Sequence, residues 1–198
     1  MAFDQAEWAK RHPKLMHSMQ AIVVILLGVL FLTECVGDDE GASVPAGDAK
    51  EDALKIYNRV IAVTADCDAS SAKLATALKG EDIVFAYRTA DQVEGNCLGV
   101  RSALAEIEIP DSITGEHRKT VEESLRACQT TYLMKWSGAQ TLKKVIDEGA
   151  RPSALAELQE TTESVERNQM LCAGGLAAVA TSLGATEKEL GIKGSGAK

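Results

Sequence analysis

The sequence is poor in aromatic residues, prolines and basic patches, and each shortage excludes a class of protein. Aromatic residues make up 4% of the chain, and the formal net charge is −8. An acidic surface repels phosphate backbones, so we expect no nucleic-acid partner. After residue 50 only Pro110 and Pro152 interrupt a sequence rich in Ala, Leu, Glu and Lys. This composition favours an all-α fold, because these residues lose little side-chain freedom in a helix.

Motifs of common enzymes and metal sites are also missing. The sequence contains no G-x-S-x-G, H-E-x-x-H, E-x-x-H or C-x-x-C motif. We therefore expect no catalytic site, no cofactor and no metal. A thiol oxidoreductase is the alternative enzyme. The expected burial of the cysteines and the absence of C-x-x-C disfavour it.

The N-terminal part holds an unbroken apolar run, AIVVILLGVLFL, at residues 21–32. Basic residues precede this run and acidic residues follow it, so the positive-inside rule predicts a cytoplasmic stub at residues 1–14 and an exported remainder. Residues 15–34 are predicted to form a transmembrane anchor or a signal segment that contacts the membrane. Residues 35–49 are predicted to form a flexible acidic linker.

The last residue of this apolar run begins the sequence Leu-Thr-Glu-Cys at residues 32–35. It resembles the lipobox of bacterial lipoproteins, in which the cysteine becomes the lipidated first residue. Glu34 departs from that pattern, which has Gly, Ala or Ser before the cysteine. Three fates remain open: an uncleaved single-span anchor, lipidation at Cys35, and ordinary cleavage. Without lipidation, Cys35 could form an interchain disulfide or remain a thiol at the membrane surface.

From about Lys50 the apolar residues recur at steps of three and four, which predicts helices. Turn signals at Gly80, Pro110 and Gly149 divide residues 50–184 into four segments of similar length. Short turns between such helices favour an antiparallel up-and-down four-helix bundle.

Local signals predict where these helices begin and end. The second helix should begin near Asp82, and Asp111 or Ser112 could cap the third. Residues 185–198 should form a short helical turn and a disordered tail, with Thr186 and Glu189 as a capping box for the turn.

The apolar face, or seam, of each of the four predicted helices carries one cysteine. Cys128 and Cys172 are equidistant from residue 150, and Cys67 and Cys97 are equidistant from residue 82. Residues equidistant from a hairpin turn lie side by side, but Cys97 and Cys128 are also symmetric about a point near the Pro110 turn. Of the three possible connectivities, Cys128–Cys172 is favoured because its symmetry is best, and Cys67–Cys97 then follows by elimination. Four buried thiols and a four-cysteine metal site are the alternatives; the cysteines lack the C-x2–4-C spacing of structural zinc sites.

Glycines surround two of these cysteines. Gly95 and Gly99 flank Cys97, and Gly174 and Gly175 follow Cys172. Because glycine destabilises a helix interior by about 1 kcal/mol, we expect these positions to allow close helix packing.

A few polar and aromatic residues on the seams are candidate binding residues. Thr64, Ser71 and Gln169 could line a small-ligand cavity or hydrogen-bond locally. Tyr132 and Trp136 could contact a partner protein or fill the core.

The same turn symmetry tests haem binding. Reflected about residue 150, His117 faces a position near residue 183, which is about 20 Å along a helix from Met170. This His–Met pair cannot ligate one iron.

Together these patterns predict a membrane-tethered interaction or accessory subunit that is not an enzyme. Its N-terminus would be cytoplasmic, its C-terminal bundle periplasmic or otherwise extracytoplasmic, and its partners proteins of a larger membrane or envelope assembly. The alternative is a lipoprotein-like or anchored periplasmic bundle that binds a small ligand as a sensor or binding module.

Overall fold

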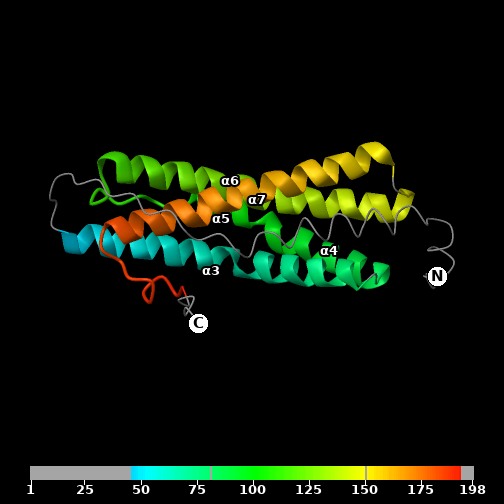
Figure 1. Ribbon diagram of the computed structural model, residues 1–198, viewed down its shortest axis with the longest axis horizontal. Helices are drawn as coiled ribbons and strands as arrows, with labels where there is room; N and C mark the ends of the chain where they lie inside the picture. Colours follow the sequence, from blue (N-terminus) through cyan, green and yellow to red (C-terminus); the bar gives the residue numbers. More distant parts are fainter. Residues whose placement is uncertain (1–45, 81, 150, 193–198) are drawn as a thin grey trace, which may run out of the picture.

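The computed structural model describes residues 46–80, 82–149 and 151–192. These ranges contain helices α3 (Ala46–Lys79), α4 (Ile83–Leu98), α5 (Val100–Ala105), α6 (Gly115–Glu148) and α7 (Pro152–Ser182), and no strand. Successive long helices run in opposite directions along one shared axis (Figure 1). The described part of the chain is therefore an all-helical bundle, as the composition predicted.

The predicted stub, anchor and Cys35 lie outside the described residues, as does the tail after residue 192. No helix within the described ranges combines the length and hydropathy needed to cross a membrane.

The first helix begins earlier than its apolar seam predicted. α3 starts at Ala46 and so includes the last residues of the predicted linker. Ala49 and Ala53 are both buried, which extends the apolar face by one turn toward the N-terminus. Asp48 in the first turn favours this start, because the N-terminus of a helix attracts negative charge.

The second predicted helix is divided into two. α4 ends at Leu98, Gly99 adopts φ −85° and ψ −14°, and α5 resumes at Val100. Val100 and Leu104 are buried, so the apolar seam continues past the interruption. Glycine lowers the stability of the helix at this position without redirecting the chain.

The third helix begins at Gly115, later than the predicted caps at Asp111 and Ser112. Ile113 is 1% exposed, so the loop must bring this side chain into the core before the helix can start. Ser112 instead donates a hydrogen bond of 2.6 Å to Asp52 of α3. The presumed cap thus ties the loop to the first helix.

The other turn signals act as expected. Asp82 accepts a hydrogen bond of 2.9 Å from the backbone N–H of Phe85, and Pro152 occupies the first turn of α7. Thr186 and Glu189 form the predicted capping box, with bonds of 2.8 and 3.3 Å between each side chain and the other residue's N–H. Glu189 also pairs with Lys50 at 2.9 Å, which joins this turn to the start of α3.

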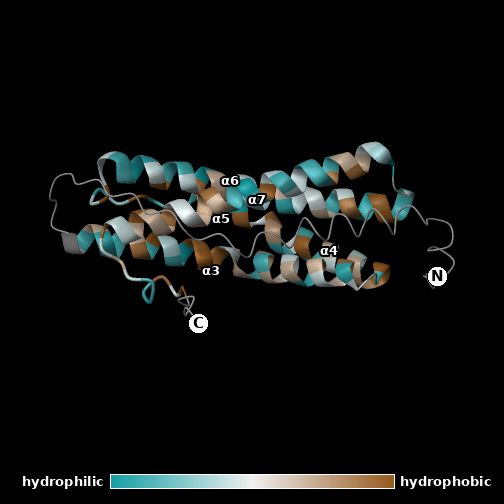
Figure 2. Ribbon diagram, viewed as in Figure 1, coloured by the Kyte–Doolittle hydropathy of each residue, from teal (hydrophilic) through white to brown (hydrophobic). Residues whose placement is uncertain are grey.

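Hydrophilic and hydrophobic residues are interspersed along each helix (Figure 2), as expected for amphipathic helices that bury one face. α6 and α7 share the most extensive interface, α4 packs on both α3 and α6, and α3 and α7 share a much smaller interface. Lys143 of α6 strengthens the α4–α6 seam by binding Asp91 at 2.7 Å and Glu94 at 3.0 Å. The bundle is therefore well closed along one seam between its hairpins and less closed along the opposite seam.

Candidate functional site

Four cysteines form two disulfides within the bundle, and we refer to the four together as the cysteine layer. Cys67 of α3 is disulfide-bonded to Cys97 of α4 with a Cα–Cα distance of 4.9 Å. Cys128 of α6 is bonded to Cys172 of α7 at 4.7 Å. These are the two pairs that the turn symmetry favoured. Each disulfide closes one hairpin, and neither connects the two hairpins.

The glycines beside the cysteines have a narrower role than predicted. A Cβ atom on Gly95, Gly99 or Gly174 would meet no atom within 4 Å, so no close approach requires glycine at these three positions. Gly175 differs, because a Cβ there would overlap Ser124 Oγ of α6 and lie 3.3 Å from Ser124 Cβ. Only this glycine of the four faces a close helix contact.

A polar cluster next to the cysteine layer links the two hairpins. Lys135 of α6 pairs with Asp68 of α3 at 2.6 Å, and Tyr132 donates a hydrogen bond of 2.8 Å to the other oxygen of Asp68. The Lys135 side chain is only 10% exposed, so Asp68 provides the partner that a nearly buried ammonium group needs. Burial and the adjacent Asp68 carboxylate raise the pKa of Tyr132 well above its usual range.

This cluster corrects one predicted partner contact. Tyr132 is 4% exposed and belongs to the core, so its ring is not accessible to a partner. Trp136 is partly buried and packs against the core. A charged Lys135 on an apolar seam signalled in the sequence that a buried partner was needed, but no local pattern identified Asp68 as that partner.

Two of the three polar seam residues, Thr64 and Ser71, hydrogen-bond within their own helix. Thr64 Oγ1 donates to the carbonyl of Ile61 at 3.3 Å, and Ser71 Oγ donates to the carbonyl of Cys67 at 2.8 Å. This local bonding is one of the two roles that the sequence allowed for them.

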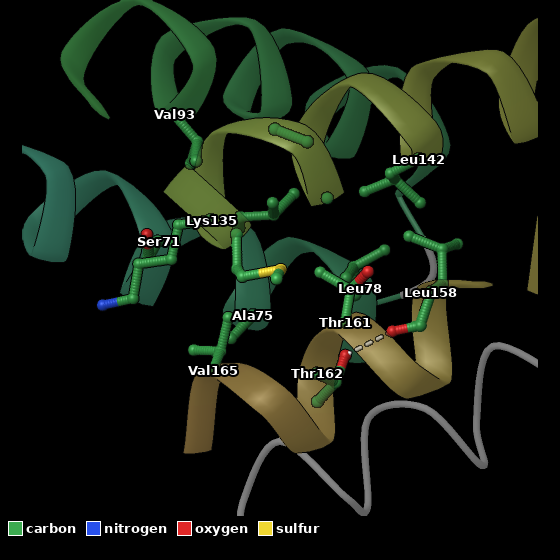
Figure 3. Close-up of a pocket in the computed structure, with 14 residues that line it drawn as sticks. Ser71, Ala75, Leu78, Val93, Lys135, Leu142, Leu158, Thr161, Thr162 and Val165 are labelled. Carbon is green, nitrogen blue, oxygen red and sulfur yellow. Dashed lines mark hydrogen bonds between the residues drawn. The ribbon is translucent and has the colours of Figure 1, made fainter. Parts of the chain in front are cut away.

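A cavity of about 150 Å³ opens where α3 and α7 diverge. α3 contributes Leu78, α6 contributes Leu142 and α7 contributes Leu158 and Val165 to its wall. Figure 3 shows these side chains converging from the three helices. Ser71 also lines the cavity, whereas Thr64 and Gln169 do not.

His117 lies beside a serine, as its reflection about the turn suggested. Its Nε2 is 3.0 Å from Ser182 Oγ at the end of α7. Ser182 Oγ also donates to the carbonyl of Val179 at 2.8 Å. When Ser182 Oγ donates to this carbonyl, the imidazole Nε2–H is the donor to Oγ, so the direction of this bond follows from the tautomer of His117. The pair ties the ends of α6 and α7 together.

Glu166 of α7 lies in an environment that disfavours its charged form. Its Oε1 is buried and has no hydrogen-bond partner within the described chain. Burial raises the pKa of this carboxyl, and the nearby Glu163 raises it further. Glu166 therefore opposes folding when it is charged.

Within the described ranges, no group of three or more His, Cys, Asp or Glu side chains is arranged to hold a metal ion. Searches of protein-family models, curated proteins and solved structures find no match to this chain.

Proposed function

We propose that this protein is a membrane-tethered, extracytoplasmic interaction or accessory subunit of a larger membrane or envelope assembly. The observation that carries the proposal is a pair of disulfides that hold large exposed apolar side chains on a rigid backbone. Disulfides of this kind persist in oxidising compartments, which supports export of the bundle.

Three of the seven exposed large apolar residues in the described ranges, including the three most exposed, lie directly beside the disulfides. Leu98 follows Cys97 and is 65% exposed, while Met170 and Leu171 precede Cys172 and are 54% and 58% exposed. The cystines fix the helices that carry these side chains. A preorganised surface loses less conformational entropy on binding, which favours partner recognition.

The chain length limits where the partner can lie. Eleven residues, 35–45, would separate an anchor that ends at residue 34 from the start of α3 at Ala46. Even fully extended, such a linker reaches only about 40 Å. The partner is therefore expected in the same membrane or close to its surface.

The experiment compares the size of the native complex with and without the exposed apolar pair on α7. Full-length protein is extracted from its own membrane in mild detergent and analysed by native electrophoresis and size-exclusion chromatography with light scattering. Wild type should migrate in an assembly larger than the single chain. The double variant Met170→Glu, Leu171→Glu should run as the isolated protein.

The matched control is Ala178→Glu, which adds a charge at another exposed position of α7. This variant should stay in the assembly. Wild-type protein that is alone and monomeric after every mild extraction would contradict the proposal, as would a double variant that remains in an assembly of unchanged size.

A further inference from the structure

The cavity between α3, α6 and α7 has no role in the function proposed above. It begins about one helical turn from the cysteine layer, at Ser71, and extends toward the α6–α7 turn as far as Leu142 and Leu158. α3 and α7, which form two of its walls, share little interface with each other. A molecule could therefore reach the interior between the two disulfide-closed hairpins without breaking either disulfide.

The hydroxyl groups of the wall give the cavity little polarity. Ser71 Oγ is bonded to the carbonyl of Cys67, and Thr162 Oγ1 donates to the carbonyl of Leu158 at 2.8 Å, the dashed line in Figure 3. Thr161 completes the set of wall hydroxyls, and its methyl group faces Gly138. Among the wall hydroxyls, those of Ser71 and Thr162 have therefore already donated their protons within the chain and can only accept a hydrogen bond from an occupant.

Lys135 does not make the cavity cationic. Its aliphatic stem lines one end, and its amino group points away from the centre (Figure 3). That amino group is held by Asp68 at 2.6 Å. An anionic ligand would have to compete with this carboxylate and lose its own hydration, so the wall favours an uncharged occupant.

The volume limits the size of the occupant. About 150 Å³ is well below the range of roughly 300–1,000 Å³ that is typical of pockets for drug-sized ligands. Apolar protein cavities of about this size, lined by aliphatic and aromatic residues, stay dry and bind benzene or xenon. The small side chain of Ala75 in the wall leaves room for this space.

We propose that the cavity is a binding site for a small, uncharged, apolar molecule of about one aromatic ring, which reaches it through the α3–α7 seam. The site depends only on the bundle, so it holds whether or not the protein joins a larger assembly.

The test uses benzene as the probe and full-length protein with ¹³C-labelled Leu and Val methyl groups. We expect saturable chemical-shift changes at the cavity methyl groups of Leu78, Leu142, Leu158 and Val165. Leu104 and Val121, buried beyond the cysteine layer, should not shift. The absence of any saturable shift up to the solubility of benzene would overturn the proposal, and so would equal shifts at Leu104 and Val121.

A matched pair of variants tests the position of the site. Ala75→Leu places a larger side chain in the cavity and should weaken benzene binding at least tenfold. Ala72→Leu makes the same change at an exposed position one turn away and should leave the affinity unchanged. Unchanged affinity in Ala75→Leu, or equal losses in both variants, would refute this site.

An enlarged cavity keeps the test decisive if Ala75→Leu does not fold. Leu158→Ala removes a wall residue, so the cavity should then accept indole, which the wild-type cavity should exclude. Indole binding of equal strength in the wild type and in Leu158→Ala would contradict the proposed size limit.

Discussion

Removing the two disulfides one at a time tests whether the cysteine layer is structural. The variants are Cys67→Ala with Cys97→Ala, Cys128→Ala with Cys172→Ala, and the fourfold replacement. Each pair removes one covalent link within a hairpin and leaves no unpaired thiol in the layer.

The expected losses follow from the loops that the disulfides close. Sequence separations of 30 and 44 residues correspond to about 3.6 and about 4.0 kcal/mol on the chain-entropy model. The two loops neither overlap nor enclose one another, so the losses should add in the fourfold variant. Because a domain of this kind is stable by only about 5–15 kcal/mol, that variant should lie at the edge of unfolding.

The assay is urea unfolding of the purified full-length chain in mild detergent, followed by far-UV circular dichroism. A reversed order of the two losses, or a fourfold variant as stable as wild type, would refute the chain-entropy reasoning. Incubation of the folded wild type with a mild thiol is the accompanying control. Cys67, Cys97, Cys128 and Cys172 are buried, so neither disulfide should be reduced before unfolding; rapid reduction of the native protein would support the thiol oxidoreductase alternative.

Three further predictions concern single residues. Gly175→Ala should destabilise the bundle by about 1 kcal/mol through overpacking, whereas Gly174→Ala should stabilise it by about 0.5–1 kcal/mol, and equal effects in thermal unfolding would contradict the close contact at Gly175. Asp68→Ala should lower the free energy of unfolding by about 2 kcal/mol, because it leaves Lys135 without a partner. Adding Lys135→Met to this variant should recover most of the loss in urea unfolding, and no recovery would contradict the pairing of Asp68 with Lys135 as the source of the stability. Glu166 has a pKa raised above its ordinary 4.5 in the folded state, so its stabilising contribution is present at low pH and is lost as pH rises through the raised value. Glu166→Gln should therefore be more stable than wild type near neutral pH by about 1 kcal/mol, with the gain disappearing toward pH 4, and a gain independent of pH would rule out this explanation.

Local signals in the sequence predicted much of the fold. The cap at Asp82, the proline at the start of α7 and the capping box at Thr186 depend on residues a few positions apart, and the structure has all three. The start of α6 was misplaced because burial of Ile113, a tertiary effect, determined where the loop could become a helix.

The candidate site was predictable only in part. The two cystine pairs connect helices that are adjacent in sequence, so counting residues from each turn brought their cysteines together. The same count also brought Cys97 and Cys128 together, and the better symmetry of Cys128 and Cys172 decided between the pairings. The Asp68–Lys135 pair connects α3 with α6, which are not consecutive helices, and no count from one turn relates them. Tyr132 was a candidate surface aromatic in the sequence because periodicity does not reveal how deeply a ring is buried.

The sequence by itself determined the helices, their apolar seams and the alignment of the cysteines, because these depend on the helical repeat and on the symmetry of short turns. Only the tertiary structure decided how far the two hairpins separate. That separation depends on how side chains from all the helices pack together, and no local pattern encodes it. The same tertiary packing leaves a cavity beside Leu78 and Leu158, brings Lys135 of α6 to Asp68 of α3, and leaves Leu98 and Leu171 exposed.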